Sequence, residues 1–93
     1  MAFENIHNMY ESLVYAEMDR HANKHSIDLE LDAYEDVACI ALNALPPRYI
    51  KHDVDAFMKM TEKEETELLA NVRSAVVAAY KKVMDKPNHE DAA

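Results

Sequence analysis

The residues that most clearly suggest chemistry lie at the double proline near the middle of the chain, in the string Pro46-Pro47-Arg48-Tyr49. Proline fixes φ and makes a stiff, extended exit from the preceding segment, so Arg48 and Tyr49 should be held in place beside it. A guanidinium can bind a phosphate or the O6/N7 edge of guanine through two parallel hydrogen bonds, and a tyrosine ring can stack on a base. The pair therefore predicts a site for a planar, anionic ligand.

Other interpretations of the same residues stay open. In one, Tyr49 only packs and Arg48 only neutralises nearby carboxylates, as such residues often do. In another, Pro46 to Tyr49 form a Pro-Pro-x-Tyr ligand for a proline-recognition domain, although such ligands occupy exposed segments and this one follows the most apolar stretch of the chain. Asn43, the one polar residue of that stretch, is expected to be buried, where an Asn usually satisfies the backbone or fixes a helix pairing.

The histidines, the cysteine and the serines give weaker signals. His21 and His25 are four residues apart, as in metal-binding helices, but the glutamate of the metalloprotease pattern is absent. We therefore expect a solvated pair at a helix end and no metal site. Cys39 lies among apolar neighbours and is expected to be an inert, buried thiol. No serine lies in a nucleophile elbow or a triad pattern, so the sequence predicts a protein that is not an enzyme.

Composition excludes several classes of site and fold. The chain has 93 residues and no glycine, so glycine-rich phosphate loops, dinucleotide fingerprints and glycine hairpins cannot occur, and we expect an all-α fold. The formal net charge is −8, with −7 over residues 1–45 and −1 over residues 46–93. Duplex nucleic acid is therefore a poor partner, and any anion site should lie in the second half. The single cysteine, the lack of a signal-peptide pattern and the lack of an apolar run near ~18 residues predict a cytoplasmic protein with no membrane contact.

Apolar periodicity and helix-start signals locate the elements. Three long helices are predicted over residues 5–24, 32–45 and 61–84. Asp32 with Glu35, and Thr61 with Glu64, have the spacing of capping boxes at the starts of the second and third helices. The double proline ends the second helix, and one short helical turn is expected within residues 48–60.

The chain is predicted to form one domain over residues 1–86, with a flexible tail at 87–93. A chain of this size buries only roughly 60–65% of the surface that it exposes when unfolded. Residues 37–45 are apolar on nearly every side and are predicted to form the central helix of the core, buried all round, while residues 75–79 are apolar on every side, so two faces of that helix need cover. A second copy of the chain is the simplest cover, and we expect a homodimer.

The string at residues 41–49, Ala-Leu-Asn-Ala-Leu-Pro-Pro-Arg-Tyr, resembles the signature of the late competence development protein ComFB family. Asp-Val-Ala at 36–38 and Glu-Asn-Ile at 4–6 are also similar to that family, so the resemblance covers about residues 3 to 83. It implies a small, helical, homodimeric bacterial protein that binds cyclic dinucleotide second messengers, cyclic di-GMP above all, in competence and motility regulation. Some relatives hold zinc in a cysteine cluster, which a chain with one cysteine cannot supply.

The resemblance also implies ligand contacts around the double proline, because cyclic di-GMP carries two phosphates and two purines. The predicted ligand-binding residues are Arg48, Tyr49, Asn43, Asp53 and Asp55, with Lys51, His52 and Arg73 added for their charge alone. The predicted function is a cyclic di-GMP receptor, without a cofactor, that relays the signal to a regulatory protein partner. The alternative is a dimeric adaptor with no small-molecule ligand, which docks a partner through its acidic first helix or the surface of its third long helix.

Overall fold

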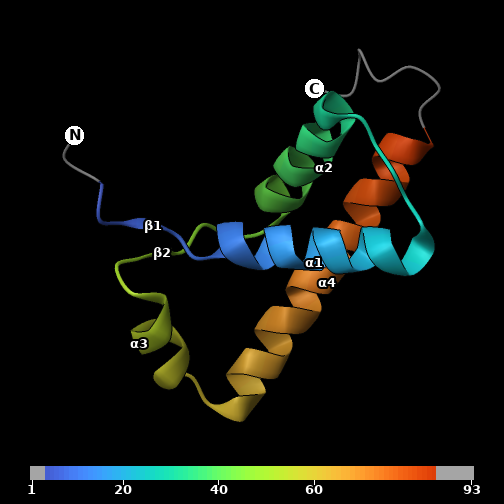
Figure 1. The fold of residues 1–93 in the computed structure, drawn as a ribbon. Helices are drawn as coiled ribbons and strands as arrows, with labels where there is room; N and C mark the ends of the chain where they lie inside the picture. The colour runs from blue at the N-terminus through green and yellow to red at the C-terminus, as the bar shows by residue number, and fades with distance from the viewer. Residues whose placement is uncertain (1–3, 86–93) are drawn as a thin grey trace.

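The computed structural model describes residues 4–85, which form four helices and two short strands (Figure 1). The predicted tail at 87–93 lies outside the described residues. The helices are α1 (Tyr10–His25), α2 (Leu31–Ala44), α3 (Asp53–Met58) and α4 (Glu62–Met84), and the strands are β1 (His7–Asn8) and β2 (Tyr49–Ile50). The mostly helical fold is confirmed, with three long helices and one short one, but the small sheet was not predicted.

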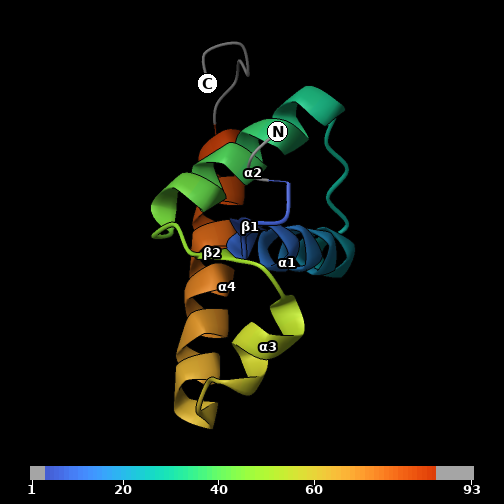
Figure 2. The ribbon, with the colours of Figure 1, turned by 90° about the vertical axis from the view of Figure 1, so that its left-hand side faces the viewer.

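Helix α4 forms the spine of the fold. Helix α1 crosses α4, and α2 packs against the C-terminal half of α4. Helix α3 lies beside the N-terminal half of α4 (Figures 1 and 2). The core lies where α1, α2 and α4 meet, and Val14, Val37 and Val76 are among its fully buried side chains. Burial of each such side chain contributes about 1.5–3 kcal/mol. None of the helices within residues 4–85 combines the length and the apolar character that a bilayer crossing requires.

The start of α4 confirms the capping box predicted at Thr61. The Glu64 amide donates to Thr61 Oγ1 (3.1 Å), and the Thr61 amide donates to Glu64 Oε1 (3.0 Å). These bonds to Thr61 hold the pKa of the Glu64 carboxyl below its ordinary value. The box predicted at Asp32 and Glu35 is wrong: α2 begins one residue earlier, at Leu31, so Asp32 already lies inside the first turn, where it cannot cap.

The start of α1 also differs from the prediction. Residues 5–9 are not helical, and His7–Asn8 instead pair antiparallel with Tyr49–Ile50. The Asn8 side-chain Oδ1 accepts hydrogen bonds from the amides of Tyr10 (3.2 Å) and Arg48 (3.3 Å), while the Met9 amide donates to the Arg48 carbonyl (2.7 Å). We call residues 7–9 and 48–50 with these bonds the β1–β2 clasp. An Asn side chain that binds a nearby backbone amide competes with helix formation, which explains the later start of α1.

Helix α1 ends at Ser26, which has φ 53° and lies in the left-handed region. It is the only residue with positive φ in the part of the chain that the structure describes. The amides of Ser26 and Ile27 both donate to the Ala22 carbonyl, so the turn satisfies an end of the helix that would otherwise lack partners.

Helix α2 is buried on one face only, which corrects the prediction of burial all round. Its fully buried residues are Ala33, Val37 and Ala41, which face α1 and α4. Cys39 and Asn43 are exposed, so neither the buried thiol nor the buried Asn exists in the single chain. The apolar run was long enough to look buried on all sides, but one chain supplies helices to cover only one of them.

A histidine stack joins the end of α1 to α4. The His21 ring lies 4.9 Å from the Tyr80 ring, centroid to centroid, and 4.5 Å from the His25 ring. The buried Tyr80 hydroxyl donates to the Met18 carbonyl (3.1 Å), which fixes the ring under His21. Burial first, and then the nearby His25, lower the pKa of His21 below its ordinary value of 6.5.

The lowered pKa of His21 predicts a loss of stability in acid. The His21 ring takes up a proton more readily in the unfolded chain than in the folded one. The contribution of neutral His21 to stability is therefore complete above pH 6.5 and is lost as the pH falls through the pKa of the folded state. Between about pH 7.5 and about pH 5.5, the melting temperature of the wild type should fall further than that of His21→Gln. Calorimetry at both pH values tests this, with His52→Gln, at an exposed histidine, as the control. Equal falls in wild type and His21→Gln would refute the prediction.

The clasp predicts a measurable role for the Asn8 carboxamide. Asn8→Ala removes the acceptor for two backbone amides and should lower the free energy of unfolding by about 1 kcal/mol. Asn8→Asp keeps an accepting oxygen at the start of α1 and should stay close to the wild type. Urea unfolding of the three proteins provides the comparison. If Asn8→Asp loses as much stability as Asn8→Ala, the accepting oxygen is not the stabilising group.

Candidate functional site

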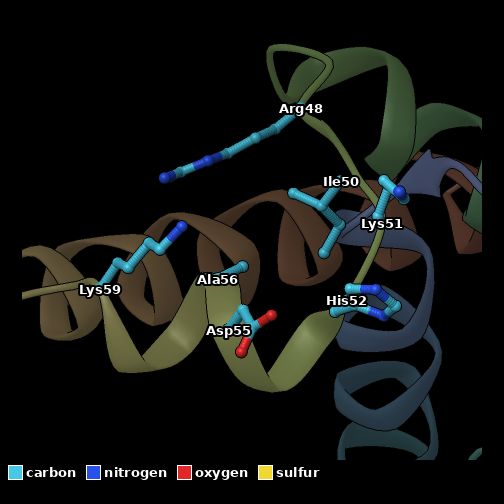
Figure 3. Close-up of a pocket in the computed structure, with 7 residues that line it drawn as sticks. All are labelled: Arg48, Ile50, Lys51, His52, Asp55, Ala56 and Lys59. Atoms are coloured by element: carbon cyan, nitrogen blue, oxygen red, sulfur yellow. The ribbon is translucent and has the colours of Figure 1, made fainter.

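A pocket of 440 Å³ lies between β2 and α3, directly after the double proline (Figure 3). Its volume falls within the ~300–1,000 Å³ that is common for small-molecule sites. Most of its polar lining residues are exposed, so the pocket is a surface hollow that a solvated ligand can enter. The lining residues are Arg48, Ile50, Lys51, His52, Asp55, Ala56 and Lys59.

Two sets of contacts hold the pocket in shape. The β1–β2 clasp binds both the amide and the carbonyl of Arg48, so the backbone that carries the guanidinium is fixed on both sides. At the other end, His7 Nε2 lies 2.8 Å from Asp53 Oδ1, which ties the start of α3 to β1. Ala56 packs against the core from α3. The N-terminal segment thus positions the walls of a pocket that lies more than 40 residues later in the chain.

The pocket concentrates positive charge. It holds three of the ten Lys and Arg residues of a chain whose net charge is −8. Figure 3 shows Arg48 and Lys59 at one side and Lys51 and His52 at the other, with Asp55 between them on α3. Arg48 also adds to the lowering of the Glu64 pKa, after the larger effect of Thr61. Cations on two sides of a hollow can bind a ligand with more than one anionic group.

The structure brings four of the eight predicted ligand residues together in this pocket, namely Arg48, Lys51, His52 and Asp55. The other four lie elsewhere. Asn43 is on the exposed face of α2, and Tyr49 is 68% exposed and does not line the pocket, since neighbours along a strand point to opposite faces. Asp53 pairs with His7, and Arg73, on α4, lies 3.7 Å from Glu17 of α1.

Sequence reasoning missed several residues of the site. Ile50, Ala56 and Lys59 line the pocket, and His7 and Asn8 position it. Lys59 had a usable signal, because it follows Asp55 by four residues and shares its face once the short helix is placed. His7 and Asn8 had none, since their partners are 46 and 40 residues away along the chain.

The ion pairs and histidines of α1 lie outside this pocket. Glu17 binds Arg20 through a 2.6 Å contact, and this hydrogen bond, more than any other cause, lowers the pKa of the Glu17 carboxyl. Within residues 4–85, no three His, Cys, Asp or Glu side chains gather as the ligands of a metal ion would.

Residues 7–87 match the family described as late competence development protein ComFB. The match begins at β1 and includes the clasp, the pocket and all four helices. No curated protein and no solved structure was similar enough to count as a match. Since the family match covers most of the chain, this protein belongs to the ComFB family.

Proposed function

We propose that this protein is a non-enzymatic receptor for cyclic di-GMP, which binds in the pocket between β2 and α3. The observation that carries the proposal is the gathering of Arg48, Lys51 and Lys59 around one hollow in a strongly acidic chain. Three cations kept together repel one another, and an anion bound between them would relieve this repulsion. The resemblance to the ComFB family is the reason for naming a cyclic dinucleotide as that anion.

Binding would act on the rest of the molecule through the clasp. A phosphate held by Arg48 pulls on a residue whose backbone is bound to Asn8 and Met9, at the start of α1. A ligand changes a conformational equilibrium only by binding one state more tightly than another. The states concerned are those of the β2–α3 segment relative to β1, and a regulatory protein partner in competence or motility control would distinguish them.

The proposal predicts saturable binding that depends on Arg48. Titration calorimetry of cyclic di-GMP should show binding to the wild type and a loss of affinity of about tenfold or more in Arg48→Ala, because a charge-assisted hydrogen bond contributes about 1.5–3 kcal/mol. Arg73→Ala is the matched control, since Arg73 is an exposed arginine outside the pocket. Recovery of the nucleotide unchanged after incubation tests the statement that the protein is not an enzyme.

Thermal unfolding provides an independent measure of the same binding. At 100 times its dissociation constant, the nucleotide should stabilise the wild type by about 2.7 kcal/mol. If cyclic di-GMP gives no heat and no thermal shift, the receptor proposal is wrong, and a dimeric adaptor without a small-molecule ligand replaces it. Equal losses in Arg48→Ala and Arg73→Ala would place the site away from this pocket.

We also propose that two copies of the chain associate through the outer face of α4. Leu69, Val77 and Met84 lie along α4 and are 41%, 43% and 50% exposed. Large apolar side chains that follow one helix are costly to leave in water, and a small domain gains most by burying them against a second copy. The same surface on both copies can meet across a two-fold axis.

Light scattering tests the dimer. The wild type should have twice the mass of the 10.7 kDa chain, and Val77→Glu should reduce it to a monomer because it places a charge in the apolar contact. Val54→Glu introduces the same change at an exposed valine of α3 and should leave the dimer intact. A monomeric wild type at micromolar concentration, or a dimeric Val77→Glu, would contradict this arrangement.

A further inference from the structure

One acidic residue stands among the cations of the pocket. Of the described residues that line it, Asp55 alone carries a carboxylate. Figure 3 shows it on α3 between His52 and Lys59. Within residues 4–85 its side-chain oxygens accept no hydrogen bond and form no ion pair, whereas the nearby Asp53 is bound to His7. Asp55 is therefore a free acceptor at the point where a bound anion would meet a negative charge.

A carboxylate in an anion-binding pocket weakens the binding of phosphate, so its presence calls for a compensating contact. Ionised Asp offers acceptors only. Guanine presents two adjacent donors on one edge, N1–H and the N2 amino group, and both can bind a single carboxylate. Adenine presents a donor, the N6 amino group, beside an acceptor, N1, so one of its two contacts with a carboxylate is repulsive. Asp55 thus has the chemistry to accept one purine and reject the other.

We infer that Asp55 reads the guanine edge of the ligand and makes the pocket selective for guanine over adenine cyclic dinucleotides. The inference rests on the proposed function of this pocket. We assign Arg48, Lys51 and Lys59, which surround it, to the phosphates that both classes of ligand share, so in this arrangement the three cations supply affinity without discrimination. Discrimination comes from the one lining group that can only accept.

The competing explanation is that Asp55 merely offsets the positive charge of its neighbours. The two explanations differ in what Asp55→Asn should do. Removing a charge offset strengthens the binding of every anionic nucleotide by a similar factor. If Asp55 instead binds the guanine edge, Asp55→Asn weakens the binding of the guanine nucleotide, because the amide of Asn supplies one acceptor and one donor where two acceptors are needed. The same amide matches the donor and acceptor of adenine.

The test is a calorimetric titration of cyclic di-GMP and cyclic di-AMP into three proteins: wild type, Asp55→Asn and Asp32→Asn. The wild type should prefer cyclic di-GMP by about tenfold or more. Asp55→Asn should lose at least about tenfold in affinity for cyclic di-GMP and keep or gain affinity for cyclic di-AMP, so that the preference disappears or reverses. Asp32→Asn, the same substitution at an exposed carboxylate of α2 outside the pocket, should keep the wild-type preference. Circular dichroism of all three confirms that the fold is retained.

The outcomes separate this inference from the proposed function. If the wild type binds cyclic di-GMP but Asp55→Asn keeps the wild-type preference, the receptor proposal stands and the role of Asp55 is wrong. An equal gain of affinity for both nucleotides in Asp55→Asn would also overturn the role of Asp55 in selectivity and would favour the charge-offset explanation. If the wild type binds neither nucleotide, the proposed function fails and this inference fails with it.

Discussion

The position of one backbone unit, that of Arg48, determines most of what the proposed site can do. Its amide is bound by the Asn8 side chain and its carbonyl by the Met9 amide, so residues far apart in the chain fix it in two directions. The two prolines before it restrict the chain but donate no hydrogen bond, so they cannot anchor it alone. The guanidinium is then presented from a rigid base toward a pocket whose other wall, α3, is tied to the same N-terminal segment by His7.

The long helices could be predicted because their signals are local. The capping box at Thr61 and the stop at Pro46 depend on residues a few positions apart, and both hold in the structure. The start of α1 could not be predicted, because the apolar spacing there fits a helix equally well. Helix α1 begins only at Tyr10 because the Asn8 side-chain oxygen accepts from the amides of both Tyr10 and Arg48. No property of residues 5–9 alone reveals that Arg48 is a partner of Asn8.

Four of the seven residues that line the pocket followed from sequence for a similar reason. Arg48, Lys51, His52 and Asp55 are close in the chain, and the short helix folds them around one hollow. Asn43 and Tyr49 were chosen for chemical type, but the side-chain direction is set by helix phase and strand alternation. Charge alone was a poor guide for Arg73, whose neighbour is Glu17 on another helix. The number of buried faces of α2 was overestimated, because an apolar run does not show how many helices of the same chain are available to cover it.

The left-handed turn is formed by Ser26 because the chain contains no glycine, and this lack of glycine affects the whole chain. Glycine is the residue that loses most conformational freedom on folding, and this protein contains none. Its unfolded state therefore samples fewer backbone conformations per residue than that of an average chain. Ordering the backbone therefore costs less entropy per residue. In return, a residue with a Cβ must occupy the geometry that glycine adopts without strain, at roughly 1–2 kcal/mol. Local strain at the end of one helix accompanies a smaller entropic cost spread over the entire sequence.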